Sequence, residues 1–428
     1  MTVEAWLDER RSGFGLQVAR ATLSHCAAWR LEEGELRHVT GRFFQVVGAE
    51  AVTPAGETWQ GPLLRQEEIG LLAFLVRESV SGHQWLLQAK AEPGNVGGVQ
   101  IAPTIQATES NFQRVHGGAA TRFIEWFLSG SDEHVVTDVL GSEIGSRFLR
   151  KRNRNALALV PAGRRVALGG AWRWFDGVEL RAVLGRSYAV GTEARSVIVS
   201  GPWSLIADGR PFSRWRGGRD FRSKLARSYE TEPEVAGTLA QLGRARAAAV
   251  PGAGQIPLQE LGDWRLDERG LHPRGRRRAS VSFVSVVAHD REVHQWCQPL
   301  MGRTGVAACD LICQEREGVL RFLLRAAWEH GLMERIELAP SRLVDDVREI
   351  ERPDDETVRL SMVQSDEGGR FLHCRTRYRI IEWSAGDAEP TRPGEHWLTL
   401  AQLEALAHQP TALTNETRTA LSLLLQWA

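Results

Sequence analysis

The sequence has little lysine, few cysteines and no long apolar run, and each shortage excludes a class of protein. No stretch approaches the roughly 20 apolar residues that span a bilayer, so we expect no contact with a membrane. Lys+Arg and Asp+Glu both number 53, which leaves no net charge to recruit nucleic acid. The first residues, 1–11, are rich in charge and lack the apolar segment of a secretory signal, so we expect a cytoplasmic protein.

The cysteines argue against a disulfide framework and against a metal site. There are 5, an odd and scattered set that is typical of reduced thiols. Cys309 and Cys313 are close in sequence, but no second pair of ligands stands at metal spacing, so we predict no metal. A Gly-x-Gly-x-x-Gly motif after a strand is also lacking, which argues against a dinucleotide cofactor.

Positive charge comes almost wholly from arginine. Lys90, Lys151 and Lys224 are the only lysines, a bias that genomic base composition alone can produce. Lysine differs from arginine in being a compact ammonium group whose pKa shifts readily. A lysine inside a polar surface of this chain therefore indicates a position where such a group is needed.

The chain contains an internal duplication. Its 428 residues exceed the roughly 250–300 at which a single core stops growing. Trp59 to Thr104 aligns without gaps on Trp296 to Ser341, with eleven of 46 positions identical. Shorter collinear matches extend this alignment on both sides, where Trp29-Arg30-Leu31 meets Trp264-Arg265-Leu266 and Arg147-Phe148-Leu149 meets Arg370-Phe371-Leu372.

These matches predict two homologous modules in tandem. We place the first at residues 1–205 and the second at 255–428, with a Gly/Arg-rich and helical connector at 206–254. Within a module, strand patterns come first and helical patterns later. Strands are expected near 43–52, 69–80 and 84–92, and helices near 119–128, 177–184 and 221–249. The expected fold class is α+β, each module having a mixed β-sheet with flanking helices.

One predicted strand carries an unusual polar face. Side chains alternate across a strand, so Trp85, Leu87, Ala89 and Ala91 share one face and the polar residues share the other. After a turn at 93–98, a returning strand presents further polar residues with the same spacing. The combined surface is rich in hydrogen-bonding groups and suits a polyhydroxylated ligand, although a solvated sheet face would look the same. Its members are Gln88, Lys90, Glu92, Gln100, Thr104, Gln106 and Thr108.

The second copy lacks this polar set. Apolar, glycine and proline positions persist between the copies, whereas the polar positions change: Lys90 aligns with Ala327, Gln106 with Leu343, Asn111 with Arg348 and His116 with Pro353. We therefore predict that the first module hosts the reaction and that the second is degenerate.

A basic cluster lies downstream, at residues 147–155. It is either a solvated charged face or a clamp for a diphosphate, because arginine forks match phosphate oxygens. The alternate spacing of Arg152 and Arg154 on an extended chain would direct both at one ligand. Trp59 could stack on a nucleotide base or fill a core.

Two stretches resemble the NDP-hexose 2,3-dehydratase family, and the resemblance covers nearly the whole chain. The first is the run Leu86-Leu87-Gln88-Ala89-Lys90-Ala91-Glu92-Pro93-Gly94-Asn95, which continues to Thr108 and is followed by Ser110-Asn111-Phe112 and Arg114-Val115-His116. The second is the cluster at 147–155. The resemblance implies a Nudix-like fold in each module, a homodimer, and a cofactor-free removal of the C2 hydroxyl from a dTDP-4-keto-6-deoxy-D-glucose substrate. It also implies deoxysugar biosynthesis, as in antibiotic pathways, with the product passed to a 3-ketoreductase.

The chain departs from the family at two places. The family's Asn-Met-Asp-x-Arg stretch reads here as Gly191-Thr192-Glu193-Ala194-Arg195, so the resemblance supports a ligand role in that loop only for Arg195. In the second module Ser341-Arg342-Leu343 replaces the usual Thr-x-Gln, so we expect no competent site there. The Nudix pyrophosphatase motif is not found, which disfavours metal-dependent nucleoside diphosphate hydrolysis.

The expected product is a 3,4-diketo-2,6-dideoxy sugar nucleotide. Its formation needs a base for the C3 proton and donors for the enolate oxygen and the leaving hydroxyl. We predict Glu92 or His116 as the base and Lys90 as the acid or the enolate stabiliser, although Glu329 in the second copy makes a structural role for Glu92 equally plausible. The alternative function is a non-catalytic sugar-nucleotide-binding protein. The predicted substrate-binding residues are Gln88, Gln100, Thr104, Gln106, Asn111, Arg147, Lys151, Arg152, Asn153, Arg154, Asn155 and Trp59.

Overall fold

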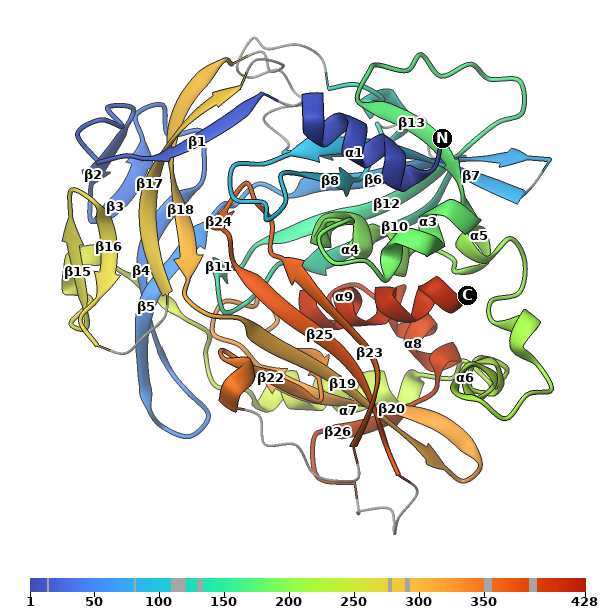
Figure 1. Ribbon diagram of the computed structural model, residues 1–428. Coiled ribbons are helices and arrows are strands. Elements are labelled where there is room, and N and C mark those ends of the chain that lie inside the picture. Colours follow the sequence, from blue (N-terminus) through green and yellow to red (C-terminus); the bar gives the residue numbers. More distant parts are fainter. Residues whose placement is uncertain are drawn as a thin grey trace.

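The computed structural model has four β-sheets and a central group of helices (Figure 1). It describes residues 1–13, 15–80, 82–108, 121–128, 134–275, 279–288, 293–349, 356–384 and 391–428. Each sheet contains both parallel and antiparallel pairs, so the fold is of mixed α and β type with mixed sheets, as predicted.

Two seven-stranded sheets, here called the large sheets, have the same strand order. The first runs β10-β12-β6-β7-β13, with β8 on β7 and β9 on β6, and the second repeats this as β23-β25-β19-β20-β26, with β21 on β20 and β22 on β19. The strands of the first are β6 (Gly70–Ser79), β7 (Gly82–Ala91), β8 (Val99–Ala102), β9 (Ile105–Ala107), β10 (Val135–Ser142), β12 (Arg152–Val160) and β13 (Trp172–Asp176). Those of the second are β19 (Ala307–Arg316), β20 (Val319–Trp328), β21 (Ile336–Pro340), β22 (Arg342–Val344), β23 (Glu356–Ser365), β25 (Arg375–Trp383) and β26 (Glu395–Leu398).

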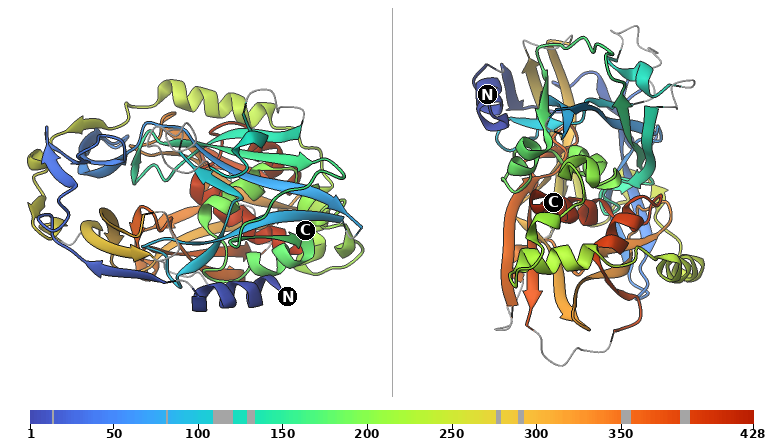
Figure 2. Two further views of the ribbon diagram at one scale, coloured as in Figure 1. Left: turned by 90° about the horizontal axis from the view of Figure 1, so that it is seen from above. Right: turned by 90° about the vertical axis from the view of Figure 1, so that its right-hand side faces the viewer.

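Two six-stranded sheets, the small sheets, pack together at one end of the molecule (Figures 1 and 2). Their shared core includes Trp29, Phe44 and Phe148 from the first half and Trp264 and Phe283 from the second. The first has β2 (Trp29–Glu32), β3 (Glu35–His38), β4 (Gln45–Val52), β5 (Thr58–Arg65), β11 (Phe148–Leu149) and β14 (Gly254–Ile256). The second has β15 (Trp264–Asp267), β16 (Gly270–Pro273), β17 (Ala279–Ala288), β18 (Gln295–Arg303), β24 (Phe371–Leu372) and β1 (Leu16–Arg20).

The small sheets exchange one strand each. β1 comes from the start of the chain but pairs with β17 of the second half, and β14 follows the connector but pairs with β4 of the first half. The duplication therefore does not give two independent bodies, because each small sheet is completed by a strand that leads into the other half.

Helices form a layer between the two large sheets (Figure 2). α4 (Thr192–Ser200) and α9 (Asn415–Leu424) pack against each other there, flanked by α3 (Gly177–Leu184) and α8 (Leu400–Ala407). α3 and α8 both begin with a capping box, formed by Asp176 with Glu179 and by Thr399 with Gln402. The remaining helices are α1 (Val3–Gly13), α5 (Ser204–Ala207), α6 (Phe221–Tyr229) and α7 (Ala236–Ala248).

Most predicted elements are present. β4, β6 and β7 occupy the three predicted strand regions, α3 matches the helix predicted at 177–184, and the connector holds two helices in place of the single one expected. None of the described helices is long and apolar enough to cross a membrane.

The helix predicted at 119–128 is wrong for its described part, 121–128. That segment contains only a 3₁₀ turn, Ile124–Trp126. Phe123, Trp126 and Phe127 are buried on the outer face of the first large sheet, so their spacing of three and four residues reflects contact of an irregular segment with the sheet. Such spacing alone cannot distinguish this arrangement from an amphipathic helix.

Candidate active site

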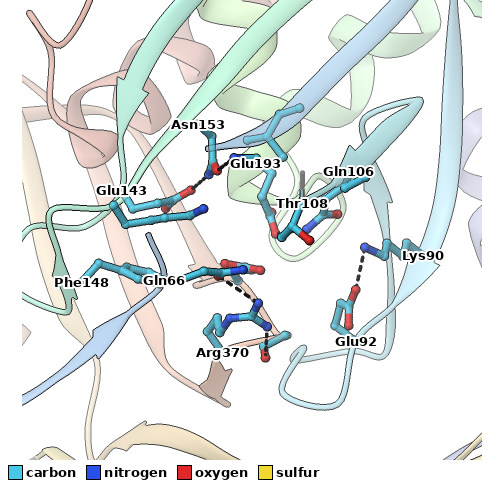
Figure 3. Close-up of a pocket in the computed structure, with 16 residues that line it drawn as sticks. Gln66, Lys90, Glu92, Gln106, Thr108, Glu143, Phe148, Asn153, Glu193 and Arg370 are labelled. Atoms are coloured by element: carbon cyan, nitrogen blue, oxygen red, sulfur yellow. Dashed lines mark hydrogen bonds and ion pairs between the residues drawn. The ribbon is translucent and has the colours of Figure 1, made fainter. Parts of the chain in front are cut away.

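A polar cavity of about 180 Å³ opens at the end of the first large sheet (Figure 3). It lies between this sheet, the start of α4 and the loop that precedes β24 in the second half of the chain. The described residues that line it are Gln66, Gly70, Leu72, Lys90, Glu92, Gln106, Ala107, Thr108, Glu143, Phe148, Lys151, Asn153, Glu193, Glu367, Gly369 and Arg370.

Strand alternation directs Lys90 into this cavity. Leu87, Ala89 and Ala91 of β7 point into the central apolar core, so Lys90 has to face the other way, as the sequence predicted. Its Nζ lies 2.8 Å from Oε1 of Glu92, which follows the end of β7. The result is a partly buried ion pair on one wall of the cavity (Figure 3).

Glu193 lies on the adjacent wall, in the first turn of α4. Gln106 of β9 donates from Nε2 to Glu193 Oε1 at 3.0 Å, which fixes the carboxyl group. Burial, followed by repulsion from Glu367, raises the pKa of Glu193 to about 8, although the charge of Lys90 opposes the shift. This carboxyl group therefore holds a proton near neutral pH.

Glu143 and Lys151 form a third group, at the start of β12. Asn153 donates from its amide to Glu143 Oε1, and its own Oδ1 accepts from Gly70 N at 3.1 Å, so the amide orientation is fixed. Burial is the main cause of both pKa shifts here: it raises the pKa of Glu143 to about 7 and lowers that of Lys151 to about 8. Lys151 Nζ also donates to the carbonyl oxygen of Glu68.

The second half of the chain supplies the remaining wall. Arg370 donates from Nη2 to Gln66 Oε1 at 3.1 Å, and its guanidinium lies 4.4 Å from the ring centroid of Phe44. Glu367 and Gly369 line the cavity beside it. The cavity is thus a composite of both halves.

A close backbone contact holds the two halves in this position. Gly94, two residues after Glu92, donates from its N–H to Gly368 O at 2.8 Å and accepts from His373 N at 2.9 Å. A Cβ at Gly94 would overlap the carbonyl oxygen of Phe371, so only glycine fits there. This contact aligns the Lys90–Glu92 wall with the loop that carries Arg370.

Several predicted residues line the cavity and others do not. Of the predicted set, Lys90, Glu92, Gln106, Lys151 and Asn153 line it. Asn111 and His116 lie outside the described residues. Gln88 lies in β7 opposite Ala102 and is not among the described lining residues.

The side chains of Gln100 and Thr104 form hydrogen bonds with other parts of the protein. Gln100 donates to Ser365 Oγ of the second half at 2.7 Å. Thr104 Oγ1 accepts from Leu75 N at 3.1 Å and donates to Leu86 O at 2.5 Å. Ser341 makes the corresponding two hydrogen bonds in the second half. Thr104 therefore stabilises the sheet by linking neighbouring strands.

The predicted arginine clamp is not formed at this cavity. Asn153 faces the cavity, so strand alternation puts Arg152 and Arg154 on the opposite face of β12. Arg154 pairs with Asp138 of the neighbouring strand, with 3.0 Å between Nε and Oδ1. Asn155 is buried and is not among the lining residues.

Arg147, Trp59 and Arg195 also lie elsewhere. Arg147 Nη2 is 3.8 Å from Asp345 Oδ1, away from the cavity. Trp59 stacks on His330, with 3.7 Å between ring centroids, so it packs against protein instead of a base. Arg195 is fully buried and donates to the carbonyl oxygens of Val190 and Leu184, which makes it structural.

A second, smaller cavity of about 40 Å³ occupies the equivalent place in the other half. Arg147 lines it as Arg370 lines the first, and Asp366, Thr376 and Glu416 take the places of Glu143, Asn153 and Glu193. Its lysine and amide equivalents are missing: Lys90 aligns with Ala327, Lys151 with Cys374 and Gln106 with Leu343. Two of the three lysines of the chain thus face the first cavity, and neither has a counterpart in the second.

Sequence reasoning missed five charged or amide side chains of the first cavity: Gln66, Glu143, Glu193, Glu367 and Arg370. Two of them had a usable signal. Glu193 occupies the acidic position of the family's Asn-Met-Asp-x-Arg stretch, and Arg370 aligns with Arg147. Glu143 and Glu367 lie a few residues before the matching Arg-Phe-Leu triplets at 147–149 and 370–372, but that match did not single them out, and Gln66 has no motif around it.

A sheltered cavity that gathers lysine and glutamate side chains with shifted pKa values is characteristic of an enzyme that performs acid–base chemistry. Residues 1–200 and 236–424 match the NDP-hexose 2,3-dehydratase family, so the chain belongs to that family.

Three relatives share the name dTDP-4-dehydro-6-deoxy-alpha-D-glucopyranose 2,3-dehydratase. The Amycolatopsis orientalis protein is 30% identical, covering 98% of this chain and 89% of its own length. The Saccharopolyspora spinosa protein is 31% identical, covering 99% and 91%, and the Streptomyces violaceoruber protein is 31% identical, covering 98% and 95%. Among solved structures, Ap4A hydrolase of C. elegans is similar to 22% of this chain and 80% of its own, at 17% identity and a TM-score of 0.18.

Proposed function

We propose that this protein is a dTDP-4-dehydro-6-deoxy-D-glucose 2,3-dehydratase and that the first cavity is its active site. Relatives that match nearly the full chain carry this name. The observation that carries the proposal is the placement of Lys90 and Lys151 in one cavity with Glu92, Glu143 and Glu193. The equivalent cavity retains carboxylates but has neither lysine, so the full set of groups occurs once among the described residues.

The reaction needs one base and suitably placed proton donors. The C4 ketone acidifies the C3 proton, and the base, Glu92 or His116, removes it to form an enolate. The C2–O bond then breaks and water leaves, which gives an enol at C3. Loss of the C3 hydroxyl proton and protonation at C2 convert this enol to the 3,4-diketo-2,6-dideoxy sugar nucleotide. No oxidant or reductant is required.

The ammonium group of Lys90 suits the developing enolate. It lies 2.8 Å from Glu92 Oε1, so one ion pair presents a base and a positive charge from the same wall. A fixed charge in a sheltered cavity stabilises an anion more than the same charge does in water. Gln106 and Asn153 supply amides on the adjacent walls for sugar hydroxyls.

The size of the cavity limits what it can hold. About 180 Å³ is below the roughly 300–1,000 Å³ that drug-sized ligands occupy. We infer that the hexose ring enters the cavity and that the dTDP moiety extends from it. Arg370 is the described lining arginine. Its Nη1 and Nη2 each donate one hydrogen, to Gly369 O and Gln66 Oε1, and each carries a second hydrogen that can bind a diphosphate oxygen.

Four further features are part of the proposal. A Nudix-like origin for each half, a homodimer, and transfer of the product to a 3-ketoreductase in a deoxysugar or antibiotic pathway rest on the family resemblance. A cytoplasmic location rests on the odd, scattered set of cysteines, which is typical of reduced thiols.

The proposal is tested with dTDP-4-dehydro-6-deoxy-D-glucose in D₂O. We expect exchange of the C3 proton and loss of water from the sugar, both followed by mass spectrometry. Binding of the nucleotide sugar without either change would instead support a non-catalytic binding protein.

Replacement of Lys90 by methionine should lower kcat by about 100-fold or more, because the enolate loses its neighbouring charge. Lys224→Met is a matched control, since Lys224 pairs with Glu382 and Glu315 at 2.7 and 3.1 Å in a remote part of the fold. The control should keep kcat within about twofold, because it loses only these two ion pairs of a partly exposed lysine. Equal kcat values in Lys90→Met and the wild type would remove Lys90 from the mechanism.

A further inference from the structure

The structure assigns a proton donor to the leaving C2 hydroxyl: we propose that the carboxyl group of Glu193 protonates this oxygen as the C2–O bond breaks. The inference rests on the proposed function and adds a catalytic residue that the sequence did not indicate. The electron pair of the C2–O bond leaves with the oxygen, the proton comes from Glu193, and water departs. Solvent then returns a proton to Glu193.

The residues around Glu193 leave space for its carboxyl group and hold it toward the cavity. The residue before the helix, Gly191, leaves space that the carboxyl group occupies: a Cβ there would lie 2.9 Å from Glu193 Oε2. Gln106 holds the other oxygen, Oε1, at 3.0 Å. In the second half the corresponding residues are Thr414 and Leu343, so neither the space nor the amide donor is reproduced around Glu416.

The charges around Glu193 favour its protonated form. Lys90 and Glu92 face it from the β7 side, Glu143 and Lys151 from the segments next to β12, and Glu367 and Arg370 from the loop before β24. Burial and the neighbouring carboxylates Glu367 and Glu143 raise the pKa of Glu193, and they outweigh the opposing effects of a hydrogen bond from its own backbone N–H and of the charge of Lys90. A donor whose pKa lies near the working pH is the most effective kind.

Glu143 and Lys90 are less suitable proton donors for the leaving C2 hydroxyl. Both oxygens of Glu143 accept amide hydrogens, from Asn153 and, at 3.3 Å, from Asn415, and such donors favour the ionised carboxylate. Glu193 accepts one amide hydrogen, from Gln106 on Oε1, and its Oε2 lies 3.3 Å from Thr192 Oγ1, a hydroxyl that can accept as well as donate. Lys90 already donates to Glu92 on the wall assigned to C3 chemistry. Glu193 stands apart from this ion pair, so removal of the C3 proton and departure of the C2 hydroxyl can use separate groups (Figure 3).

The test separates the two steps of the reaction. In Glu193→Gln the base and the Lys90 charge remain, so C3 exchange with D₂O should persist within about threefold while water loss falls by about 100-fold or more. Glu416→Gln makes the same change at the equivalent helix position beside the second cavity. It should leave both rates within about twofold.

Each other outcome has a defined meaning. Loss of C3 exchange together with water loss in Glu193→Gln would show that Glu193 acts before elimination, and full water loss would show that it is not the donor; either result overturns the inference. If Glu193→Gln does not fold, Gln106→Leu, which copies Leu343, is measured at saturating substrate so that weaker binding of the sugar does not affect the rates. It should reduce water loss with C3 exchange retained, and a proportional loss of both would count against the inference. A wild-type protein that shows neither reaction would refute the proposed function itself.

Discussion

Four carboxyl groups line the cavity: Glu92 is paired with Lys90, and the crowding of the other three is the main electrostatic feature of the site. Glu143, Glu193 and Glu367 line a space of about 180 Å³, and repulsion from Glu367 contributes to the raised pKa of the other two. Lys151 and Lys90 provide partial compensation. Because burial disfavours each charge, the site retains protons near neutral pH that the unfolded chain would release.

Because the folded protein retains a proton on Glu193, its stability should depend on pH in a specific way. The pKa of Glu193 is raised from 4.5 in the unfolded reference to about 8 in the folded protein. Its contribution to the free energy of unfolding is therefore fully present below about pH 4.5 and is lost as pH rises through about 8. Glu193→Gln does not titrate, so the loss of stability between pH 5 and pH 9 should be smaller in this variant by about 1 kcal/mol or more.

Chemical denaturation at both pH values measures this difference. Glu143, Glu337 and Lys151 also have shifted pKa values, and all three are present in both proteins. Their contributions to the pH dependence therefore cancel when the variant is compared with the wild type. An equal pH dependence in the two proteins would mean that Glu193 is ionised in the folded state at neutral pH.

Lys90 could be predicted from sequence because its signal is local. Strand alternation fixes its face, and its rarity in an arginine-rich chain marks it. Glu143 and Glu367 lie close to the matching Arg-Phe-Leu triplets, but that match does not indicate that the fold brings residues of both halves to one cavity.

At the scale of the elements, strand alternation succeeded in β7 and failed in β12 for the same reason. A period of two assigns residues to faces but does not say which face meets the cavity. In β7 the apolar set Trp85, Leu87 and Ala89 identified the core face. In β12 the first four residues are polar on both faces, so no apolar set marks the core face; the cavity receives Asn153, and the arginine face meets Asp138 of β10.

Gly94, in the turn after β7, allows a second test by mutation. Gly94→Ala would force a Cβ into the carbonyl oxygen of Phe371, so the Lys90–Glu92 wall would move away from the loop that carries Arg370. We expect a destabilisation of about 1–3 kcal/mol and a fall in kcat of about tenfold or more. Thermal unfolding and steady-state kinetics measure the two effects.

Gly243→Ala provides a matched control in α7. No atom lies within 4 Å of a Cβ built at Gly243, and alanine favours a helix over glycine by roughly 0.5–1 kcal/mol. This variant should be as stable as the wild type or slightly more so, with kcat unchanged. Similar behaviour of the two variants would mean that the contact of Gly94 with the second half does not position the cavity.

At the scale of the whole molecule, duplication and function are linked through exchange between the halves. β1 and β14 each complete the small sheet of the other half, and each cavity takes one wall from the other half. Collinear matches in the sequence revealed two similar halves but carried no information on this exchange. Short strands such as β14 (Gly254–Ile256) are too brief for a pairing partner to be read from their residues.

The exchange reverses the expected roles of two aligned arginines and gives a direct test. The sequence assigned Arg147 to substrate binding as part of the basic cluster at 147–155, whereas Arg370 lines the first cavity and Arg147 lines the smaller one. We expect Arg370→Ala to raise KM by about tenfold or more, equivalent to about 1.4 kcal/mol, because the cavity rim loses a guanidinium donor that reaches the substrate. Arg147→Ala should change KM by less than about threefold. A larger effect of Arg147→Ala would show that each half binds substrate with its own residues, and that the second half is not required for the first cavity to function.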